Sequence, residues 1–216
     1  MIEFAYNPPD TPLVFLHSDD QMFVMDKPSG LLSVPGKLEG RSDCLISRLQ
    51  AVHPDALLVH RLDCDTSGVI VFARNKVAQG WLGQEFEKRV AKKVYVARLW
   101  GHLTPATGRV DLPLCADWPN RPRQMVDPER GRPAQTDWQV TEDETTGSRV
   151  RLMPLTGRSH QLRVHMAELG HPILGDPIYA TGGAREFPRL MLHAESLTLR
   201  HPATKEFVMF RAEVPF

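Results

Sequence analysis

The sequence predicts an α+β fold with a mixed, largely antiparallel β-sheet that is flanked by helices and loops. Apolar runs of strand length outnumber segments with helical spacing, and short turns join most of these runs. The composition of 42% hydrophobic and 24% charged residues over 216 residues is typical of a globular protein with a core of its own. We expect an extended, proline-rich arm over residues 1–13 and a single domain over residues 14–216.

In the first half of the chain, strands are predicted at residues 14–16, 22–25, 57–59, 69–72 and 94–100, and helices at residues 45–52 and 77–86. Each strand is a short apolar run, and the turn signal Ser18-Asp19-Asp20 separates the first two. Apolar residues at helical spacing define both helices. Ser42-Asp43 supplies an N-cap for the first helix, and Pro54 ends it.

In the second half, residues 101–135 are rich in proline and glycine, and we expect them to lack regular structure. A stretch of that length inside a compact domain is usually functional. A helix is expected from Gly157, ended by Gly170 and Pro172. Strands are predicted at residues 136–140, 149–154, 190–193, 197–199 and 207–210.

The cysteines and the apolar runs exclude several classes of protein. Cys44, Cys64 and Cys115 are odd in number and form no CxxC pair, which argues against a disulfide framework and a zinc site. No apolar run approaches 18 residues, so no membrane span is expected. Residues 1–7 have neither the basic nor the apolar region of a signal peptide. We therefore expect a cytoplasmic protein.

Charge is balanced overall but unevenly distributed. The chain has 26 basic and 26 acidic residues. Residues 1–60 carry four basic and eight acidic side chains, a net of −4, whereas residues 85–132 carry ten and six, a net of +4. A local basic face can attract phosphates even in a neutral protein, although an ordinary solvated surface explains the same numbers.

Two polar clusters stand out from the surrounding apolar runs. The first, His60–Gly68, places Arg61 and Asp63 on the same side of an extended backbone, although a polar loop with an Arg–Asp pair fits as well. The second is Thr156–His165. Its two histidines lie five residues apart, whereas helical metal-binding pairs prefer four.

The bland interpretation of the second cluster is the start of an amphipathic helix, in which Arg158 and His165 are simply solvated. Considered together, the two clusters suggest another arrangement. A carboxylate near a strand end and an arginine on a nearby helix can form a bidentate pair. Such a pair would keep Asp63 ionised and fix the orientation of its carboxylate.

In order along the chain, six segments resemble the motifs of the RluA family of pseudouridine synthases. They are Lys27–Gly30, His60–Asp63 with Thr66–Gly68, Lys92–Ala97, Thr156–His165, Gly175–Tyr179 and Leu192–Ala194. The ordered set is highly specific, and the resemblance runs from about residue 14 to the C-terminus. Residues 111–114, 117–122 and 133–136 are similar to the family's dual-specificity subgroup, whereas Cys64-Asp65 departs from it.

The resemblance implies the pseudouridine synthase catalytic fold without the S4 RNA-binding domain that many relatives carry. It implies isomerisation of uridine in the anticodon arm of certain tRNAs and in a stem-loop of 23S rRNA, with no metal and no cofactor. Asp63 would be the catalytic carboxylate, Arg163 its partner and Tyr95 the aromatic that stacks on uracil. Arg61 would enter the space that the flipped uridine leaves.

The basic, proline-rich segment 101–132 would then hold the RNA backbone. The candidate RNA-binding residues are Lys92, Lys93, Arg109, Arg121 and Arg123. We expect a monomer without an obligatory protein partner. Two alternatives remain open: Asp63-Cys64-Asp65-Thr66 fits the DxDxT signature of Mg²⁺-dependent phosphatases, and a non-catalytic RNA-binding protein could share the scaffold.

Overall fold

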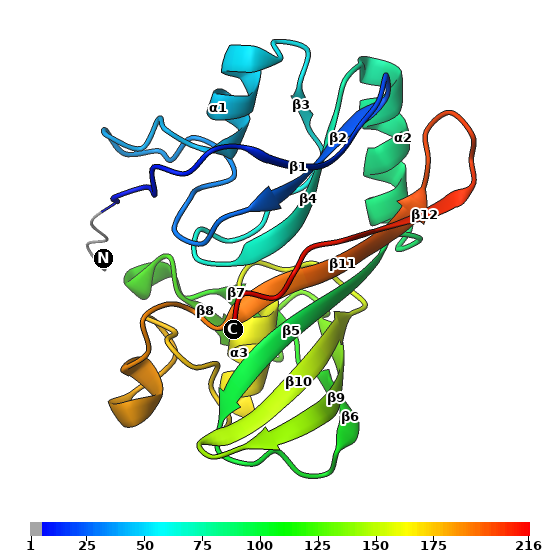
Figure 1. Cartoon of the computed structure of the whole chain (residues 1–216). Helices are drawn as coiled ribbons and strands as arrows, with labels where there is room; N and C mark the ends of the chain where they lie inside the picture. Colours follow the sequence, from blue (N-terminus) through cyan, green and yellow to red (C-terminus); the bar gives the residue numbers. More distant parts are fainter. Residues whose placement is uncertain (1–5) are drawn as a thin grey trace. The chain divides into compact units, whose positions relative to one another are not determined.

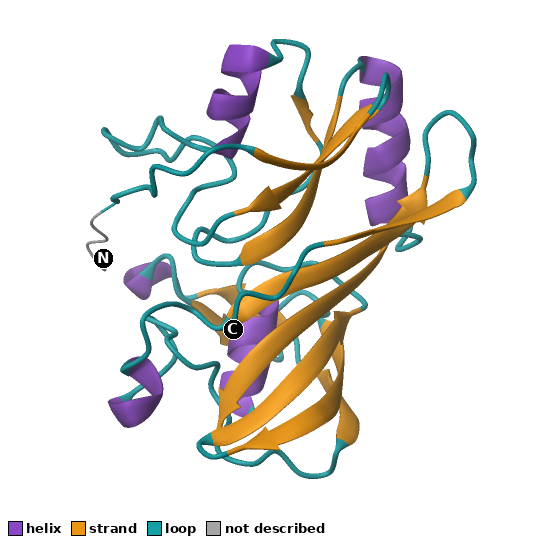
Figure 2. Cartoon of the chain, in the orientation of Figure 1, coloured by secondary structure: helices purple, strands orange, loops and turns teal. Residues whose placement is uncertain are grey.

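A computed structural model describes residues 6–216, so the first five residues of the predicted arm lie outside the described part of the chain. The described residues form twelve strands, three α-helices and two short 3₁₀ helices (Figures 1 and 2). In chain order they are β1 (Val14–Ser18), β2 (Met22–Lys27), α1 (Leu45–Val52), β3 (Leu57–Leu58), β4 (Ser67–Ala73), α2 (Lys76–Glu87), β5 (Lys92–Trp100), β6 (Thr107–Asp111), β7 (Leu114–Ala116), η1 (Trp118–Asn120), β8 (Gln124–Val126), β9 (Gln135–Glu144), β10 (Gly147–Pro154), α3 (Gln161–Glu168), η2 (Gly182–Arg185), β11 (Leu192–Arg200) and β12 (Phe207–Arg211).

These elements form two compact units. The central unit contains Val94–Leu192 and Phe216, and the terminal unit contains Tyr6–Lys93 and His193–Pro215. The interpretation of residues 14–216 as a single catalytic domain stays a prediction.

The terminal unit is built on strands β1, β2, β4 and β11 in that order, with β3 paired to β4 and β12 paired to β11. β2 runs antiparallel to β4, whereas β4 and β11 are parallel, which confirms the predicted mixed sheet. Every residue of β4 is buried, and Ala78 and Leu82 of α2 pack into the same core. A strand buried on both faces reads as a continuous apolar run, as Val69–Phe72 does.

The central unit has an antiparallel sheet in the order β5, β10, β9, β6, and β7 pairs with β8 in a separate hairpin. Its core is formed by Leu99, Val150 and Leu152 of the sheet together with Leu162 and Met166 of α3. The two α3 residues are four positions apart, which is the helical spacing that predicted this element. Gly170 follows α3 in a left-handed conformation, as a C-terminal glycine should.

The prediction that residues 101–135 lack regular structure was wrong. They contain β6, β7, η1 and β8. β6 is five residues long and only Val110 is buried, and β7 and β8 have three residues each. Such short strands show no detectable period in the sequence, and they form because β9 and the hairpin partner supply their hydrogen bonds.

Several element boundaries also differ from the prediction. The N-cap of α1 is Cys44, whose amide donates to the Ser47 hydroxyl, because the Asp43 carboxylate pairs with Arg48 instead. Helix α3 begins at Gln161 rather than near Gly157, and the two predicted strands at 190–193 and 197–199 are one strand, β11. No helix within residues 6–216 is long and apolar enough to cross a lipid bilayer.

Candidate active site

Packing fixes the start of the loop that carries Asp63. The His60 ring stacks on Phe86 with centroids 4.4 Å apart, and its Nε2 accepts a hydrogen bond from the Val71 amide at 3.2 Å. Burial, with a smaller contribution from the charge of Lys93, lowers the pKa of His60 to about 3. His60 is therefore a neutral, structural residue at physiological pH. Its contacts with Phe86 and Val71 hold the start of the loop that carries Asp63.

The backbone on both sides of Asp63 is held by hydrogen bonds within the terminal unit. The Leu62 amide donates to the Ser33 hydroxyl at 3.1 Å, and that hydroxyl donates to the Leu62 carbonyl at 2.8 Å. The Cys64 carbonyl accepts from the Lys27 ammonium at 2.7 Å. Because both neighbouring peptides are fixed and Leu62 is buried, the position of the Asp63 backbone is set before any substrate binds.

Lys27 is the central support of this loop. Its side chain is fully buried, and its Nζ donates to the carbonyls of Pro28 at 2.9 Å, Leu31 at 2.6 Å and Cys64 at 2.7 Å. A buried ammonium requires such compensation, because desolvation without hydrogen bonds is very costly. The Gly30 amide reinforces the contact by donating to the same Cys64 carbonyl at 3.0 Å. The Lys27–Gly30 motif thus connects directly to the segment that contains Asp63.

The side chains of this loop differ in their surroundings. Arg61 is exposed, Leu62 is buried and Asp63 is half-buried. Burial, followed by the charge of Asp65, raises the pKa of the Cys64 thiol to about 12, so the thiol stays protonated. Asp63 lies outside a strand, after β3 has ended at Leu58. The phosphatase signature would need the carboxylate directly after an apolar strand, so this alternative is not supported.

The parallel pairing of β4 with β11 explains two more motif segments. Ser67 lies opposite His193 and Gly68 opposite Ala194, and the Ser67 hydroxyl and His193 Nδ1 are 2.8 Å apart. Gly68 has a φ of +107°, and a side chain there would collide with the Ala194 carbonyl. Only glycine fits this close approach between strands without strain.

In the central unit, Arg163 of α3 forms a buried bidentate ion pair with Asp176. Arg163 Nε and Nη2 donate to the two carboxylate oxygens at 2.7 Å each, and the side chains are only 3% and 0% exposed. The Ile178 and Tyr179 amides also donate to Asp176. Burial alone would raise the pKa of Asp176, but the hydrogen bonds and charge of Arg163 outweigh it, so the pKa lies below its ordinary value.

Sequence reasoning assigned no role to Asp176, although it stands in the Gly175–Tyr179 motif segment. A guanidinium has five N–H donors, and the bonds to Asp176 use two of them. The chemistry of Arg163 therefore allows a second carboxylate as a partner. The predicted pairing of Arg163 with Asp63 stays a prediction.

Tyr179 connects Asp176 to the loop after β7. Its hydroxyl accepts from the Gln124 amide at 2.8 Å and lies 2.9 Å from His160 Nδ1. Burial raises the pKa of Tyr179 to about 12, so the phenol stays protonated. Arg123 lies 5.0 Å from the centre of the Tyr179 ring and donates to the Ile178 carbonyl at 2.9 Å. This tyrosine therefore fixes the loop that carries Arg123.

Other residues of the Thr156–His165 segment hold α3 against β9. Gln161 Nε2 of the side chain donates to the Gln135 carbonyl at 2.9 Å. His165 is fully buried between the Thr136 hydroxyl at 2.9 Å and the Leu112 carbonyl at 3.1 Å, and burial lowers its pKa. The interpretation of His165 as a solvated surface residue was wrong, because both of its ring nitrogens have hydrogen-bond partners inside the protein.

The remaining predicted site residues lie on strands and loops of both units. Tyr95 is half-buried on β5, opposite Leu152 of β10, and packs against the central core. Lys92 is exposed, whereas burial lowers the pKa of Lys93 to about 8. Arg109 forms an ion pair with Asp137 at 2.5 Å. Arg121 stacks on Trp118, with its guanidinium carbon 3.9 Å from the ring centre.

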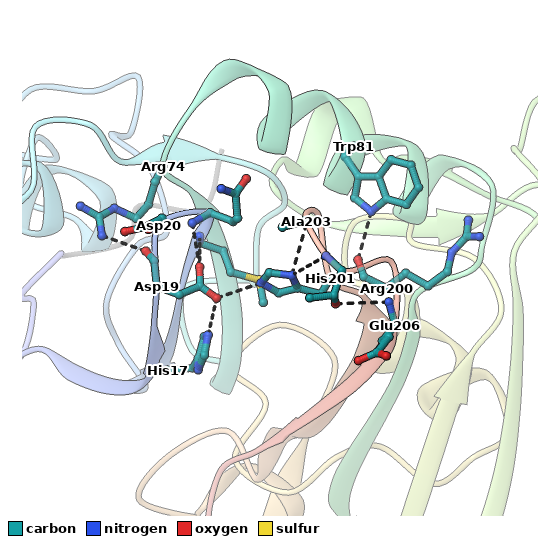
Figure 3. A network of polar contacts seen from close by, with 12 residues as sticks. His17, Asp19, Asp20, Arg74, Trp81, Arg200, His201, Ala203 and Glu206 are labelled. Atoms are coloured by element: carbon teal, nitrogen blue, oxygen red, sulfur yellow. Dashed lines mark hydrogen bonds and ion pairs between the residues drawn. The ribbon is translucent and has the colours of Figure 1, made fainter.

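A further polar network joins the β1–β2 turn to the β11–β12 connection in the terminal unit (Figure 3). Asp19 Oδ2 lies 2.7 Å from His17 Nε2 and 2.9 Å from His201 Nε2, and Arg74 donates to the Asp19 carbonyl at 2.8 Å. Burial alone would raise the pKa of Asp19, but the bonds from His17, the Gln21 amide and His201 bring it well below its usual range. This network stabilises the turn that the sequence predicted.

The structure thus groups the predicted catalytic residues by unit. Arg61 and Asp63 share the β3–β4 loop of the terminal unit, and Tyr95 and Arg163 belong to the central unit. Within residues 6–216, no group of three or more His, Cys, Asp or Glu side chains is arranged to hold a metal ion.

The family model and the relatives that match this chain all describe RNA pseudouridine synthases. Residues 21–168 match the family model described as RNA pseudouridylate synthase. The chain is 56% identical over 216 residues to the dual-specificity RNA pseudouridine synthase RluA of Escherichia coli O157:H7, covering 98% of each protein. It is 51% identical over 209 residues to the protein of that name from Vibrio parahaemolyticus, covering 94% of this chain and 84% of the relative.

A solved structure agrees with the sequence matches. Human RNA pseudouridylate synthase domain containing 1 superimposes with a TM-score of 0.80 at 30% identity, covering 97% of this chain and 87% of the human one. The match includes residues of both units, and it confirms the α+β fold predicted from the sequence. The chain therefore belongs to the RNA pseudouridylate synthase family.

Proposed function

We propose that this chain, an RNA pseudouridine synthase, modifies uridines in stem-loops of both tRNA and 23S rRNA. The observation that carries the proposal is the 56% identity, over 98% of each chain, to a dual-specificity RNA pseudouridine synthase. Substrate selection depends on surfaces across the whole protein, and a match of this extent includes them. Action on these RNAs would place the enzyme in the cytoplasm.

The reaction class defines what the residues must do. The bond between ribose C1′ and N1 of uracil breaks, the base turns, and C1′ bonds to C5. The C5 proton leaves and N1 gains a proton, so atoms and charge balance within one nucleotide. Because there is no net redox change and no group leaves the RNA, we expect the reaction to proceed without metal or cofactor and to survive EDTA.

In this proposal Asp63 is the catalytic carboxylate. Its support is the rigid loop on which it stands, with Leu62 fixed by Ser33 and the Cys64 carbonyl fixed by Lys27. Positioning a reacting group before the substrate arrives removes much of the entropic cost of reaching the transition state. Arg163 is proposed as the cationic partner of the Asp63 carboxylate.

Two further residues would handle the flipped nucleotide. Tyr95 offers an aromatic ring on which uracil can stack, a contact worth about 1–3 kcal/mol per base. Arg61, exposed at the start of the catalytic loop, would fill the space that the extruded uridine leaves in the RNA. Unpaired loops lower the cost of extrusion, which is consistent with stem-loop substrates.

The RNA backbone would contact the basic residues Lys92, Lys93, Arg109, Arg121 and Arg123. Their contributions should differ, because Arg109 is already paired with Asp137. Arg121 is exposed on the loop after β7, and Arg123 is fixed next to it by Tyr179 and Ile178. We expect these two arginines to contribute most to the salt dependence of RNA binding.

The test uses purified protein with two transcripts, a tRNA anticodon stem-loop and a 23S rRNA stem-loop, followed by chemical mapping of pseudouridine. We expect wild-type protein to modify both. Asp63→Asn should abolish modification while RNA affinity and the melting curve stay near wild type. Modification of only one transcript would overturn dual specificity, and turnover by Asp63→Asn would remove Asp63 from the mechanism.

A further inference from the structure

The loop after β7 exposes an indole. Trp118 is 67% exposed at the start of η1, and Pro119 and Asn120 beside it are exposed as well. A tryptophan side chain is highly buried on average, since its transfer out of water stabilises the fold. An exposed tryptophan on a loop therefore contributes little to folding, and it is better explained by binding.

Arg121 prepares this indole for a flat ligand. Its guanidinium lies over the ring, 3.9 Å from the centre, and its Nε donates to the Trp118 carbonyl at 3.0 Å. The hydrogen bond keeps the cation on one face of the indole. Because Trp118 is still 67% exposed with the guanidinium in place, much of the residue remains accessible to a ligand.

The loop is rigid, so ordering it on binding would cost little. The Asp117 amide donates to the Arg123 carbonyl at 3.0 Å, and the Arg123 amide donates to the Asn120 carbonyl at 3.0 Å. The Asn120 side chain also donates to the Asp117 carboxylate at 3.0 and 3.1 Å. Pro119 limits the backbone further.

The loop is also joined to the Arg163 ion pair within the central unit. The Gln124 amide donates to the Tyr179 hydroxyl, and the Tyr179 amide donates to Asp176, the partner of Arg163. Arg123 donates to the Ile178 carbonyl in the same segment. A ligand on Trp118 would thus be held at a fixed distance from Arg163.

We propose that Trp118 and Arg121 form a stacking platform for one unpaired base of the RNA substrate, a nucleotide other than the uridine that is modified. This inference rests on the proposed function. A ring with a guanidinium on one face suits a base, because the arginine adds a positive charge beside the phosphates. An apolar protein partner would gain nothing from that charge, so the observations favour RNA.

The test measures binding of the anticodon stem-loop by wild-type, Trp118→Ala and Trp118→Phe proteins. Loss of one base-stacking contact should weaken binding roughly 5- to 150-fold in Trp118→Ala, and Trp118→Phe should recover much of it. Phe207→Ala is the matched control, because Phe207 is 65% exposed on β12, and it should bind like wild type. Melting curves of all variants should coincide.

Abasic substitutions identify the stacked base. At one loop position, an abasic nucleotide should weaken wild-type binding and leave Trp118→Ala unchanged, whereas the other positions should affect both proteins equally. The protein has four tryptophans, so quenching by RNA is assigned to Trp118 from the difference between wild type and Trp118→Phe.

Equal affinity of Trp118→Ala and wild type, or the absence of RNA quenching of Trp118, would overturn the platform and leave this loop as a surface for another partner. The proposed function fails separately, if wild-type protein makes no pseudouridine in either transcript.

Discussion

Asp176→Asn tests the buried ion pair of the central unit with a change of almost no volume. The wild-type carboxylate accepts two bonds from Arg163 and one each from the Ile178 and Tyr179 amides, at 2.7 to 3.0 Å. An asparagine amide has one acceptor oxygen and one donor nitrogen. If the oxygen keeps the two backbone amides, the amide nitrogen faces Arg163 Nε, donor against donor.

The magnitude follows from burial. Both side chains are at most 3% exposed, so water cannot replace the lost bond. Removing one partner of a buried pair costs about 3–5 kcal/mol, and we expect the lower end because the asparagine oxygen still accepts. The pKa of Asp176 is below its ordinary value, so the carboxylate is fully ionised at neutral pH and the whole cost appears there. The difference should shrink as pH falls through the folded-state pKa.

Urea denaturation of wild type and Asp176→Asn at pH 7, followed by circular dichroism, measures this cost. Asp137→Asn is the control, since it breaks the Arg109 ion pair, which is accessible to water, and should shift the transition far less. Equal shifts for the two variants would refute the reasoning that burial determines the contribution of Asp176.

Three other perturbations follow from the structure. Burial lowers the pKa of His60 from 6.5 to about 3, so below pH 6.5 the unfolded chain binds a proton that the folded chain does not. The free energy of unfolding should therefore fall as pH drops below 6.5, by up to about 1.4 kcal/mol per pH unit. In a pH titration of stability, the slope should be shallower for His60→Gln than for wild type, and an unchanged slope would contradict this. Gly68→Ala should lower the free energy of unfolding by at least about 1–2 kcal/mol because of its positive φ alone, and the collision with Ala194 adds to this loss. Gly80→Ala in α2 is the control, because Gly80 has open space around it, and it should be neutral or stabilising in the same urea denaturation assay. Tyr95→Phe keeps the aromatic face, so we expect RNA affinity near wild type with slower turnover if the hydroxyl assists removal of the C5 proton; a wild-type single-turnover rate would exclude that role.

Local signals in the sequence predicted much of the fold. The apolar run Val69–Phe72 became the fully buried β4, and the Ser18–Asp20 turn separates β1 and β2. These elements depend on side chains only a few positions apart. Val77, in contrast, is the first apolar residue of the helix predicted over residues 77–86, and it is 83% exposed because Ala78 and Leu82 form the buried face of α2 instead.

The site was less predictable, because its supports are long-range. Asp176 and Arg163 are separated by a helix end and a turn, and no periodic pattern in the sequence predicts their ion pair. In the sequence, Lys27 is part of a short loop motif. In the structure it supports the Asp63 loop through the Cys64 carbonyl, 37 residues away along the chain. Charge and hydrogen-bond partners of buried groups are decided by tertiary packing, which spacing alone does not encode.

The hydrogen bonds from Lys27 to the loop that carries Asp63 affect which substitutions that loop tolerates. All three acceptors of its ammonium are main-chain oxygens, and every amino acid supplies one. The thiol at position 64 takes no part in these hydrogen bonds, so the residue next to Asp63 can be exchanged while the carboxylate keeps its place. A different side chain directly after Asp63, such as the cysteine found here, is thus compatible with an unchanged position of this loop.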